Sequence, residues 1–444
     1  MGQRGTTETA IYATEFEQDV MDLLVETLRR AVRREEQVVG TDTLLGELVL
    51  GDWEAGETIA PGMRKAGSLS GLIAARAGRG WVSDDEVHGD AARDAAVASA
   101  RTGERAYDEA DAEADRREVG AAWREARWRH GLATRRSDQD GGRELPGMTG
   151  GLRACLLLAL RSARAEGTVA VRCRHVARAL LELPGTRARE ALVLEKLDTA
   201  AAATALDTLD AGASVETERP ESRGVTVLRR SGTLGRSGNR LSRALYSWTA
   251  QSSANGSPVV VAVTIEAGRW AARHGRAKPE PVDLLLGILA LDRALSVVGR
   301  SLPGNLAYAN AAPEVLRAHG VPQVSLVAAV AEIPFAALPE GGGDHQGDDG
   351  QGSPLSAADR VVAIARLSAA EHGSPTVGTV HLLAALLDER TTRVGADPDP
   401  GPDSKADTDT DTGTGTDAVV RLLAAAHVDV PALRAELRLR QGES

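Results

Sequence analysis

The sequence predicts an all-α fold made of four diverged copies of one helical unit. The first observation is a pattern of two adjacent apolar residues followed by two more one helical turn later, which places four apolar side chains on one helical face. It occurs at Leu44/Leu45/Leu48/Val49, Val176/Ala177/Leu180/Leu181, Leu284/Leu285/Ile288/Leu289 and Leu382/Leu383/Leu386/Leu387. The second is composition: 42% of the residues are hydrophobic but only 3% are aromatic, which suits cores of packed Ala-, Val- and Leu-rich helices. A recurring unit decides the fold of a long chain.

We expect the four units to pair into two domains that are joined by polar linkers. The predicted boundaries are 10–211 for the first domain (repeats 10–80 and 148–211, charged helical insertion 81–147), 212–239 for a linker, and 240–440 for the second domain (repeats 240–333 and 354–440, linker 341–353, acidic loop 395–417). Each repeat begins with an apolar-periodic helix, continues with a motif helix that carries the leucine pattern, and ends with shorter closing helices.

The first repeat opens with a predicted helix over 14–35, and its motif helix follows over 42–50. In the second repeat the motif helix covers 175–183, where Pro184 and Gly185 end it. The insertion between them is dense in Ala, Asp, Glu and Arg from Ser83 to His130. Two interpretations remain open for it: a long solvated helix held by charge pairs, or partial disorder.

The linker over 212–239 is rich in Ser, Gly, Arg and Thr. We interpret it as a solvated connector, with phosphate contact as the alternative. In the third repeat, Val259 to Ile265 has the β-branching of a strand, but the continuing apolar period favours a helix. In the fourth repeat, Thr379 is expected to cap the motif helix and Asp429 the last helix.

Composition and motifs exclude several classes of function. The net charge of −11 argues against a nucleic-acid binder, and no apolar run approaches the roughly 18 residues of a membrane span, so the cytoplasm is the expected compartment. No Gly-Lys-Ser/Thr, His-Glu-x-x-His or Cys-x-x-Cys motif is present. We therefore expect no cofactor, no metal and no catalysis. Cys155 and Cys173 fit best as small core residues.

The fourth repeat resembles the Clp R repeat of the N-terminal domain of Clp ATPases. The similar residues are Thr376-Val377-Gly378-Thr379-Val380-His381-Leu382-Leu383 and the closing run from Leu422 to Leu433, and Val39-Gly40-Thr41-Asp42-Thr43-Leu44 is the next best match. In that family two repeats pack about a pseudo-twofold axis, so four would form two such domains. Because the P-loop is missing, the resemblance implies a stand-alone protein without the ATPase modules.

The resemblance also implies where a ligand would bind. Family members dock adaptors, substrates, arginine-phosphorylated proteins or cyclic-peptide antibiotics, and an acidic residue in their Gly-Thr-Glu-His segment pairs with the phosphoarginine guanidinium. The matching positions here are Asp42, Arg174, Val282 and Val380, of which only Asp42 is acidic. The candidate ligand-binding residues are therefore Thr41, Asp42, Thr379 and His381. For all four, helix capping or packing is the alternative role.

We expect a non-catalytic module that binds peptides, adaptors, other Clp-system proteins or cyclic-peptide ligands. The alternative is a structural scaffold whose repeats pack on one another or on further copies. An enzyme of an unrecognised type is a third interpretation, which no constellation of nucleophile, base and orienting group supports.

Overall fold

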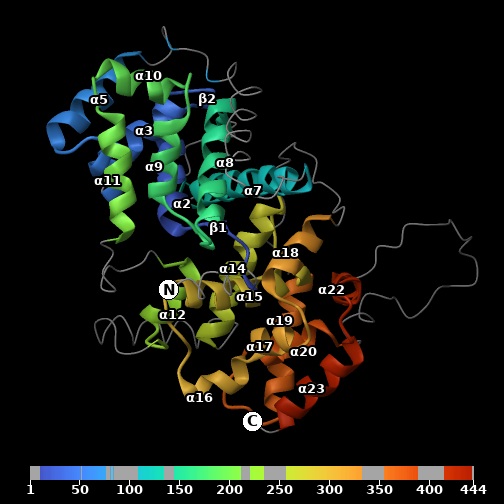
Figure 1. Ribbon diagram of the computed structural model, residues 1–444. Coiled ribbons are helices and arrows are strands. Elements are labelled where there is room, and N and C mark those ends of the chain that lie inside the picture. Colours follow the sequence, from blue (N-terminus) through green and yellow to red (C-terminus); the bar gives the residue numbers. More distant parts are fainter. Residues whose placement is uncertain are drawn as a thin grey trace, which may run out of the picture. The chain divides into compact units, whose positions relative to one another are not determined.

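The computed structural model describes residues 11–51, 53–76, 81, 84, 109–134, 145–211, 221–234, 257–332, 355–388 and 415–442. These residues are mostly helical, which confirms the all-α class (Figure 1). The chain divides into two compact units: unit 1 comprises Met1–Thr9 and Thr14–Pro220, and unit 2 comprises Ala10–Ala13 and Glu221–Ser444. Common descent of the repeats stays a prediction.

Unit 1 contains nine described helices and four two-residue strands. They are β1 (Glu15–Phe16), α2 (Gln18–Arg33), β2 (Val38–Val39), α3 (Thr41–Leu50), α4 (Glu54–Ile59), α5 (Met63–Arg76), α7 (Glu109–Thr134), β3 (Gly147–Met148), α8 (Gly150–Ala165), β4 (Ala170–Val171), α9 (Cys173–Glu182), α10 (Arg187–Leu194) and α11 (Thr199–Ala211). The first predicted helix, 14–35, was too long at its start because Glu15 and Phe16 pair as a strand. Cys155 and Cys173 are buried, as expected.

Two short parallel ladders connect the two halves of unit 1. β1, which precedes α2, pairs with β4, which precedes the motif helix α9. In the same way β3, which precedes α8, pairs with β2, which precedes the motif helix α3. The backbone bonds repeat this exchange at 3.0 Å: Glu15 N donates to Val169 O, and Gly147 N donates to Gln37 O. Each half therefore depends on the other to complete its ladders.

Helix α7 belongs to the charged insertion and packs against α2 and α8. One of its faces is buried through Val119, Ala122 and Ala126. Asp115 is also buried and forms ion pairs with Arg161, at 3.3 Å, and with Arg164. The expected helix is thus present over these residues, but it is not solvated on all sides. Residues 85–108 and 135–144 of the insertion lie outside the described residues.

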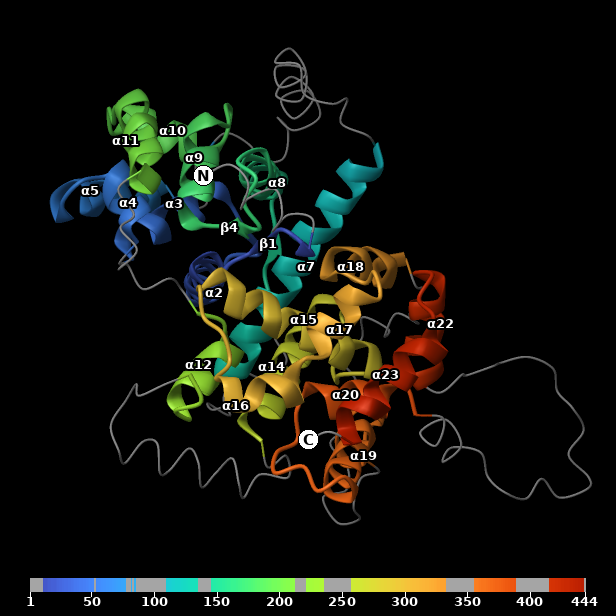
Figure 2. The same cartoon turned by 60° about the horizontal axis from the view of Figure 1, so that its bottom comes forward.

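All regular secondary structure among the described residues of unit 2 is helical. It contains α12 (Arg223–Arg230), α14 (Pro258–Arg273), α15 (Pro281–Val297), α16 (Gly304–Ala307), the 3-10 helix η1 (Tyr308–Asn310), α17 (Ala312–Ala318), α18 (Gln323–Glu332), α19 (Ala357–Glu371), α20 (Thr379–Leu386), α22 (Gly415–Ala425) and α23 (Val430–Gly442). Figure 2 shows α20 beside α19 and α23, against which it packs. The predicted linker 341–353 and most of the acidic loop 395–417 lie outside the described residues, and α22 begins within the end of that loop.

Three local predictions in unit 2 have clear outcomes. Residues 259–265 are helical within α14, as predicted. Asp429 does cap the last helix, because its Oδ1 accepts a hydrogen bond from Ala432 N at 3.0 Å. The linker over 212–239 was wrong in part, because it contains α12, whose Val225 and Leu228 lie one turn apart and are buried in the core. Residues 212–220 and 235–239 lie outside the described residues.

One connection recurs four times in the chain. After each first helix, a residue with positive φ allows the chain to turn, and a backbone N–H bonds back to a carbonyl five residues earlier, which is the Schellman arrangement. The positive-φ residues are Glu35, Gly167, Gly275 and Gly373. In each case the motif helix begins at the sixth residue after it, so α3, α9, α15 and α20 occupy equivalent places.

No helix in the described part of the chain is both long and apolar enough to cross a membrane.

Candidate functional site

The backbone N–H of the first residue of a helix has no acceptor within that helix. In three motif helices a side chain from elsewhere in the same unit accepts this N–H, and the fourth helix begins with proline, which has none. The bonds are Thr41 N to Asp84 Oδ2 at 2.7 Å, Cys173 N to Asp19 Oδ2 at 3.1 Å and Thr379 N to Asn310 Oδ1 at 3.0 Å, and the proline is Pro281. Internal groups therefore occupy the position where a helix N-terminus would bind an anion.

The third residue of a motif helix also has a structural role. In three of the helices its side chain accepts the N–H of the residue that precedes the helix. These bonds are Arg172 N to His175 Nδ1 at 2.8 Å, Glu280 N to Asp283 Oδ2 at 2.9 Å and Gly378 N to His381 Nδ1 at 3.2 Å. The predicted cap at Thr379 was wrong: Gly378 is the N-cap, and Thr379 is the first helical residue.

In unit 1, Thr41 is fully buried at the start of α3, where it contacts a buried carboxylate. The Asp84 carboxylate accepts hydrogen bonds from the Thr41 hydroxyl at 3.0 Å, the Thr149 hydroxyl at 3.2 Å and Arg187 N at 2.9 Å. Thr41 Oγ1 in turn accepts Ala188 N at 3.1 Å. Thr41 therefore helps to join α3 to the start of α10.

Asp42 is only 5% exposed, and its carboxylate lies 3.8 Å from the Arg187 guanidinium. Burial raises the pKa of Asp42 to about 6, Arg187 opposes the rise, and the negative charges of Asp84 and Glu36 add to it. Its Oδ1 has no hydrogen-bond partner among the described residues. A carboxyl group in this state is poorly placed to bind a guanidinium from solvent.

Thr379 and His381 are buried in unit 2, at 3% and 1% exposure. Burial lowers the pKa of His381, and the neighbouring His372 lowers it further, so the imidazole is neutral near pH 7. Because Nδ1 accepts Gly378 N–H, the proton of the neutral ring is assigned to Nε2. Nε2 and the Thr379 hydroxyl lack hydrogen-bond partners among the described residues.

The equivalent histidine of α9 has different surroundings. His175 Nε2 lies 3.1 Å from Glu166. Burial would raise the pKa of Glu166, but hydrogen bonds and charge from His175 and Arg174 lower it to about 2. Among the described residues, His381 has no such acidic partner, and His372 occupies the position that is equivalent to Glu166.

Two glycines explain part of the motif at the starts of α3 and α20. A Cβ on Gly378 would lie 2.1 Å from Ala309 O, and one on Gly40 would lie 2.4 Å from Asp42 Oδ1. Neither glycine has positive φ, so close approach, and not backbone conformation, favours glycine there. These glycines, Asp84 and Asn310 were missing from our candidate residues. Of these four residues, only the glycines could have been found from the sequence, because each one directly precedes a predicted site residue, Thr41 or Thr379.

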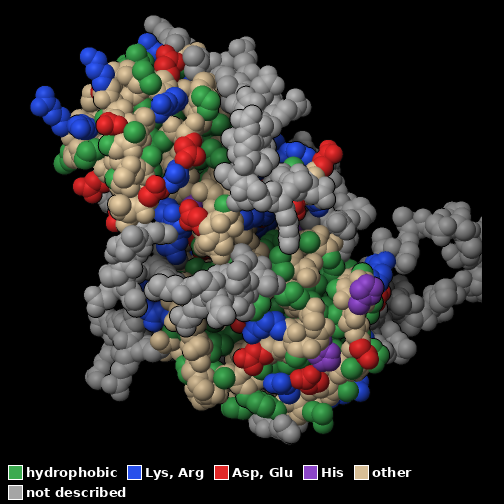
Figure 3. Space-filling model, viewed as in Figure 1, with side chains coloured by type: hydrophobic (Ala, Val, Ile, Leu, Met, Phe, Trp, Pro, Cys, Tyr) green, Lys and Arg blue, Asp and Glu red, His purple; other side chains and the backbone are tan. Residues whose placement is uncertain are grey.

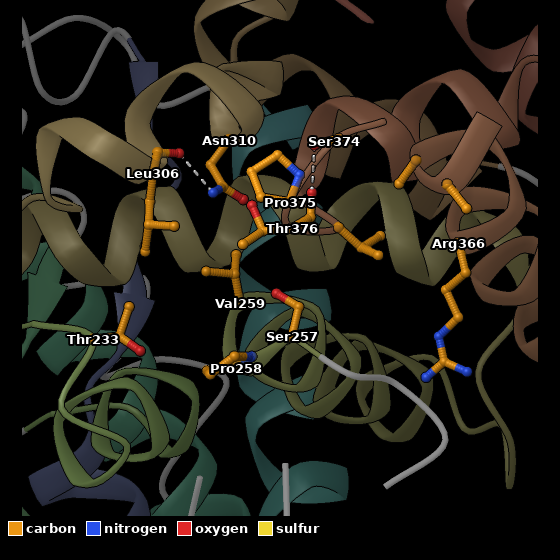
Figure 4. Close-up of a pocket in the computed structure, with 13 residues that line it drawn as sticks. Thr233, Ser257, Pro258, Val259, Leu306, Asn310, Arg366, Ser374, Pro375 and Thr376 are labelled. Carbon is orange, nitrogen blue, oxygen red and sulfur yellow. Dashed lines mark hydrogen bonds between the residues drawn. The ribbon is translucent and has the colours of Figure 1, made fainter. Parts of the chain in front are cut away.

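The candidate binding site of unit 2 is a pocket of about 330 Å³ next to the α20 start (Figure 4). Its apolar lining comes from the start of α14, from Leu306, from the loop before α20 and from α19. It includes Pro258, Val259, Pro375, Val377 and Ala370. None of the four predicted site residues lines it, but Asn310 does and also accepts the Thr379 N–H.

Most polar groups of this pocket are engaged internally. The Asn310 amide donates to Leu306 O at 2.7 Å, and Ser374 Oγ donates to Thr376 O at 2.9 Å, as Figure 4 shows. Arg366 is the single charged side chain among the described lining residues. The pocket therefore combines an apolar surface with one positively charged side chain, which also interacts within the protein.

The described residues contain no group of three or more His, Cys, Asp or Glu that could hold a metal ion. Burial raises the pKa of the Cys155 and Cys173 thiols, so neither is an activated nucleophile. On the face seen in Figure 3, acidic, basic and apolar side chains are interspersed, without an extended basic patch on the coloured surface.

Comparisons with protein-family models, curated proteins and solved structures return no match to this chain.

Proposed function

We propose that this protein is a non-catalytic peptide- or protein-binding module that resembles the N-terminal domain of Clp ATPases. The observation that carries the proposal is the unit 2 pocket, in which an apolar lining lies beside Arg366. Binding pockets commonly combine an apolar surface with a few polar groups that orient the ligand. By the resemblance, the ligands are Clp-system adaptors, substrates or cyclic peptides. The proposed compartment is the cytoplasm, as expected from the sequence.

The lining indicates the chemistry of the ligand segment. Pro258, Val259 and Pro375 offer apolar contacts, while a guanidinium favours a carboxylate. The proposed ligand is thus an extended segment that carries an apolar side chain next to Asp, Glu or a C-terminal carboxylate. Phosphoarginine recognition at Asp42 is not part of this proposal, because that carboxyl group is buried.

The test is a fluorescence-anisotropy titration of the full chain with the labelled peptide Gly-Ser-Leu-Leu-Glu-Leu-Gly-Ser. Arg366→Gln should weaken binding about two- to fivefold, the range for an exposed charge pair. Ala370→Glu should weaken binding further. Ala370 is an exposed lining residue, and a carboxylate at that position would repel the glutamate of the peptide. The matched control is Arg360→Gln, an exposed arginine on the same helix.

Unchanged binding in both pocket variants would overturn the unit 2 site. Equal weakening by Arg360→Gln would show that general charge, and not the pocket, governs the affinity. Circular dichroism confirms that each variant keeps its helical content.

The second candidate is a structural scaffold, which the burial of Thr41, Asp42, Thr379 and His381 favours, because these residues serve helix starts. Such a scaffold would associate with copies of itself or hold other chains by surfaces outside the pockets. Sedimentation that shows a monomer independent of concentration would count against self-association.

A further inference from the structure

A second pocket lies in unit 1, where the end of α3 meets the starts of α4 and α5, and it has a volume of about 620 Å³. Trp53 lines it, and its rim exposes large apolar side chains. Met63 is 93% exposed and Leu50 is 45% exposed. A hollow with exposed apolar side chains at its rim is typical of an interaction surface.

The charge of this pocket is opposite to that of the unit 2 pocket. Of the described residues that line it, only Glu54 and Glu57 are charged. They lie three positions apart on α4 and are exposed, and neither forms an ion pair with another described residue. The end of α3 borders the pocket without a basic residue in its last turn, so its carbonyl groups add negative potential.

We propose that the unit 1 pocket binds an extended segment of a partner protein that carries Lys or Arg next to a large apolar side chain. The apolar side chain packs on Trp53 and Met63, and the cation lies between Glu54 and Glu57. A lysine or arginine suits this arrangement because its aliphatic stem covers apolar surface while its charged end stays hydrated. Complementary charge then sets specificity. The inference adds a site with the opposite charge preference to the proposed function.

The experiment uses two labelled peptides with the full chain at low ionic strength. One is Gly-Ser-Leu-Leu-Lys-Leu-Gly-Ser, and the other has Glu in place of Lys. We expect the double variant Glu54→Lys/Glu57→Lys to lose about tenfold in affinity for the Lys peptide, since two rim charges are reversed. The affinity of this double variant for the Glu peptide, which binds the unit 2 pocket, should not fall. Arg366→Gln should weaken binding of the Glu peptide and leave binding of the Lys peptide unchanged. The two sites can therefore fail independently.

A second variant and a control complete the design. Met63→Ser should weaken the Lys peptide about threefold by removing an apolar contact, and its 93% exposure means that the core is left intact. The control Glu109→Lys/Asp111→Lys makes the same charge change at exposed positions of α7. The proposal is overturned if the Lys peptide does not bind the wild type at millimolar concentration. It is equally overturned if neither pocket variant weakens binding, or if the control weakens it as much.

Discussion

The starts of α3 in unit 1 and α20 in unit 2 share the residues Gly-Thr but are completed differently. At α3, the Asp84 carboxylate accepts four hydrogen bonds, from Thr41, Thr149 and Arg187. At α20, the side-chain oxygen of Asn310 accepts one hydrogen bond, from the Thr379 N–H. At both starts the N-cap is glycine, which has no side chain to cap the helix, so a residue from elsewhere in the same unit accepts the first N–H. That partner also decides whether the surroundings are acidic or neutral.

The largest expected difference between the two starts concerns their glycines. Gly378→Ala should destabilise unit 2 by about 3 kcal/mol, because the new Cβ would meet the Ala309 carbonyl, which cannot move independently of the backbone. Gly40→Ala should cost less, about 1 kcal/mol, since its contacts are side-chain atoms that can shift. Urea unfolding followed by circular dichroism measures both.

The control for the glycine pair is Gly71→Ala, within α5, where the added Cβ meets nothing within 4 Å. It should stabilise the protein by about 0.5–1 kcal/mol. An equal cost for Gly378→Ala and Gly40→Ala would contradict the distinction between backbone and side-chain contact.

The second difference concerns the acceptors. Asp84→Ala should cost about 2–3 kcal/mol, because it leaves several buried donors without an acceptor. Asn310→Ala removes the acceptor of Thr379 N and should cost about 1 kcal/mol. Thermal unfolding of both variants ranks their losses of stability. A larger loss for Asn310→Ala than for Asp84→Ala would contradict the prediction.

The third difference is a pH dependence in unit 1. The pKa of Asp42, about 6 when folded, lies above its ordinary value of 3.8, so the folded state favours the protonated carboxyl. The contribution of protonated Asp42 to the free energy of unfolding is fully present below about pH 4. It is lost as the pH rises through 6, and the loss reaches up to about 3 kcal/mol. Asp42→Asn should remove this slope, so the variant gains stability relative to wild type between pH 4 and 6. Parallel urea titrations across that range test the expectation, and curves with equal slopes would contradict it.

The smallest difference is the opposite pH dependence in unit 2. Burial lowers the pKa of His381 below 6.5, so the folded state favours the neutral ring. This contribution is present above pH 6.5 and is lost as the pH falls below it. In His381→Asn the amide oxygen can still accept Gly378 N–H without titrating. The variant should therefore unfold with less pH dependence between 6.5 and 5, as thermal melts would show. A wild type that gained stability on acidification through His381 would refute the assignment.

The helices were predictable because the period of apolar residues indicates which face of a helix is buried. This period correctly predicted a helix even at the Val-rich start of α14. The same criterion missed α12, whose two buried anchors, Val225 and Leu228, lie in a polar, arginine-rich segment. Short helices with few apolar residues leave little periodic signal.

The candidate site was less predictable, because the predicted site residues serve the fold and line neither pocket. Nothing near Asp84 marks it as the partner of Thr41, since the two are far apart in the sequence and meet only through folding. Pocket residues such as Trp53 and Val259 come from helix ends that no short motif connects.

The reciprocal ladders of unit 1 have a consequence for how this unit can be made. A fragment with only residues 11–76, or only 145–211, would carry one strand of each ladder and the mate of neither. Neither fragment can form the ladders by local contacts. The paired strands are more than a hundred residues apart in the sequence, and contacts between such distant segments slow folding. During synthesis, the first half must remain without these bonds until the second has left the ribosome.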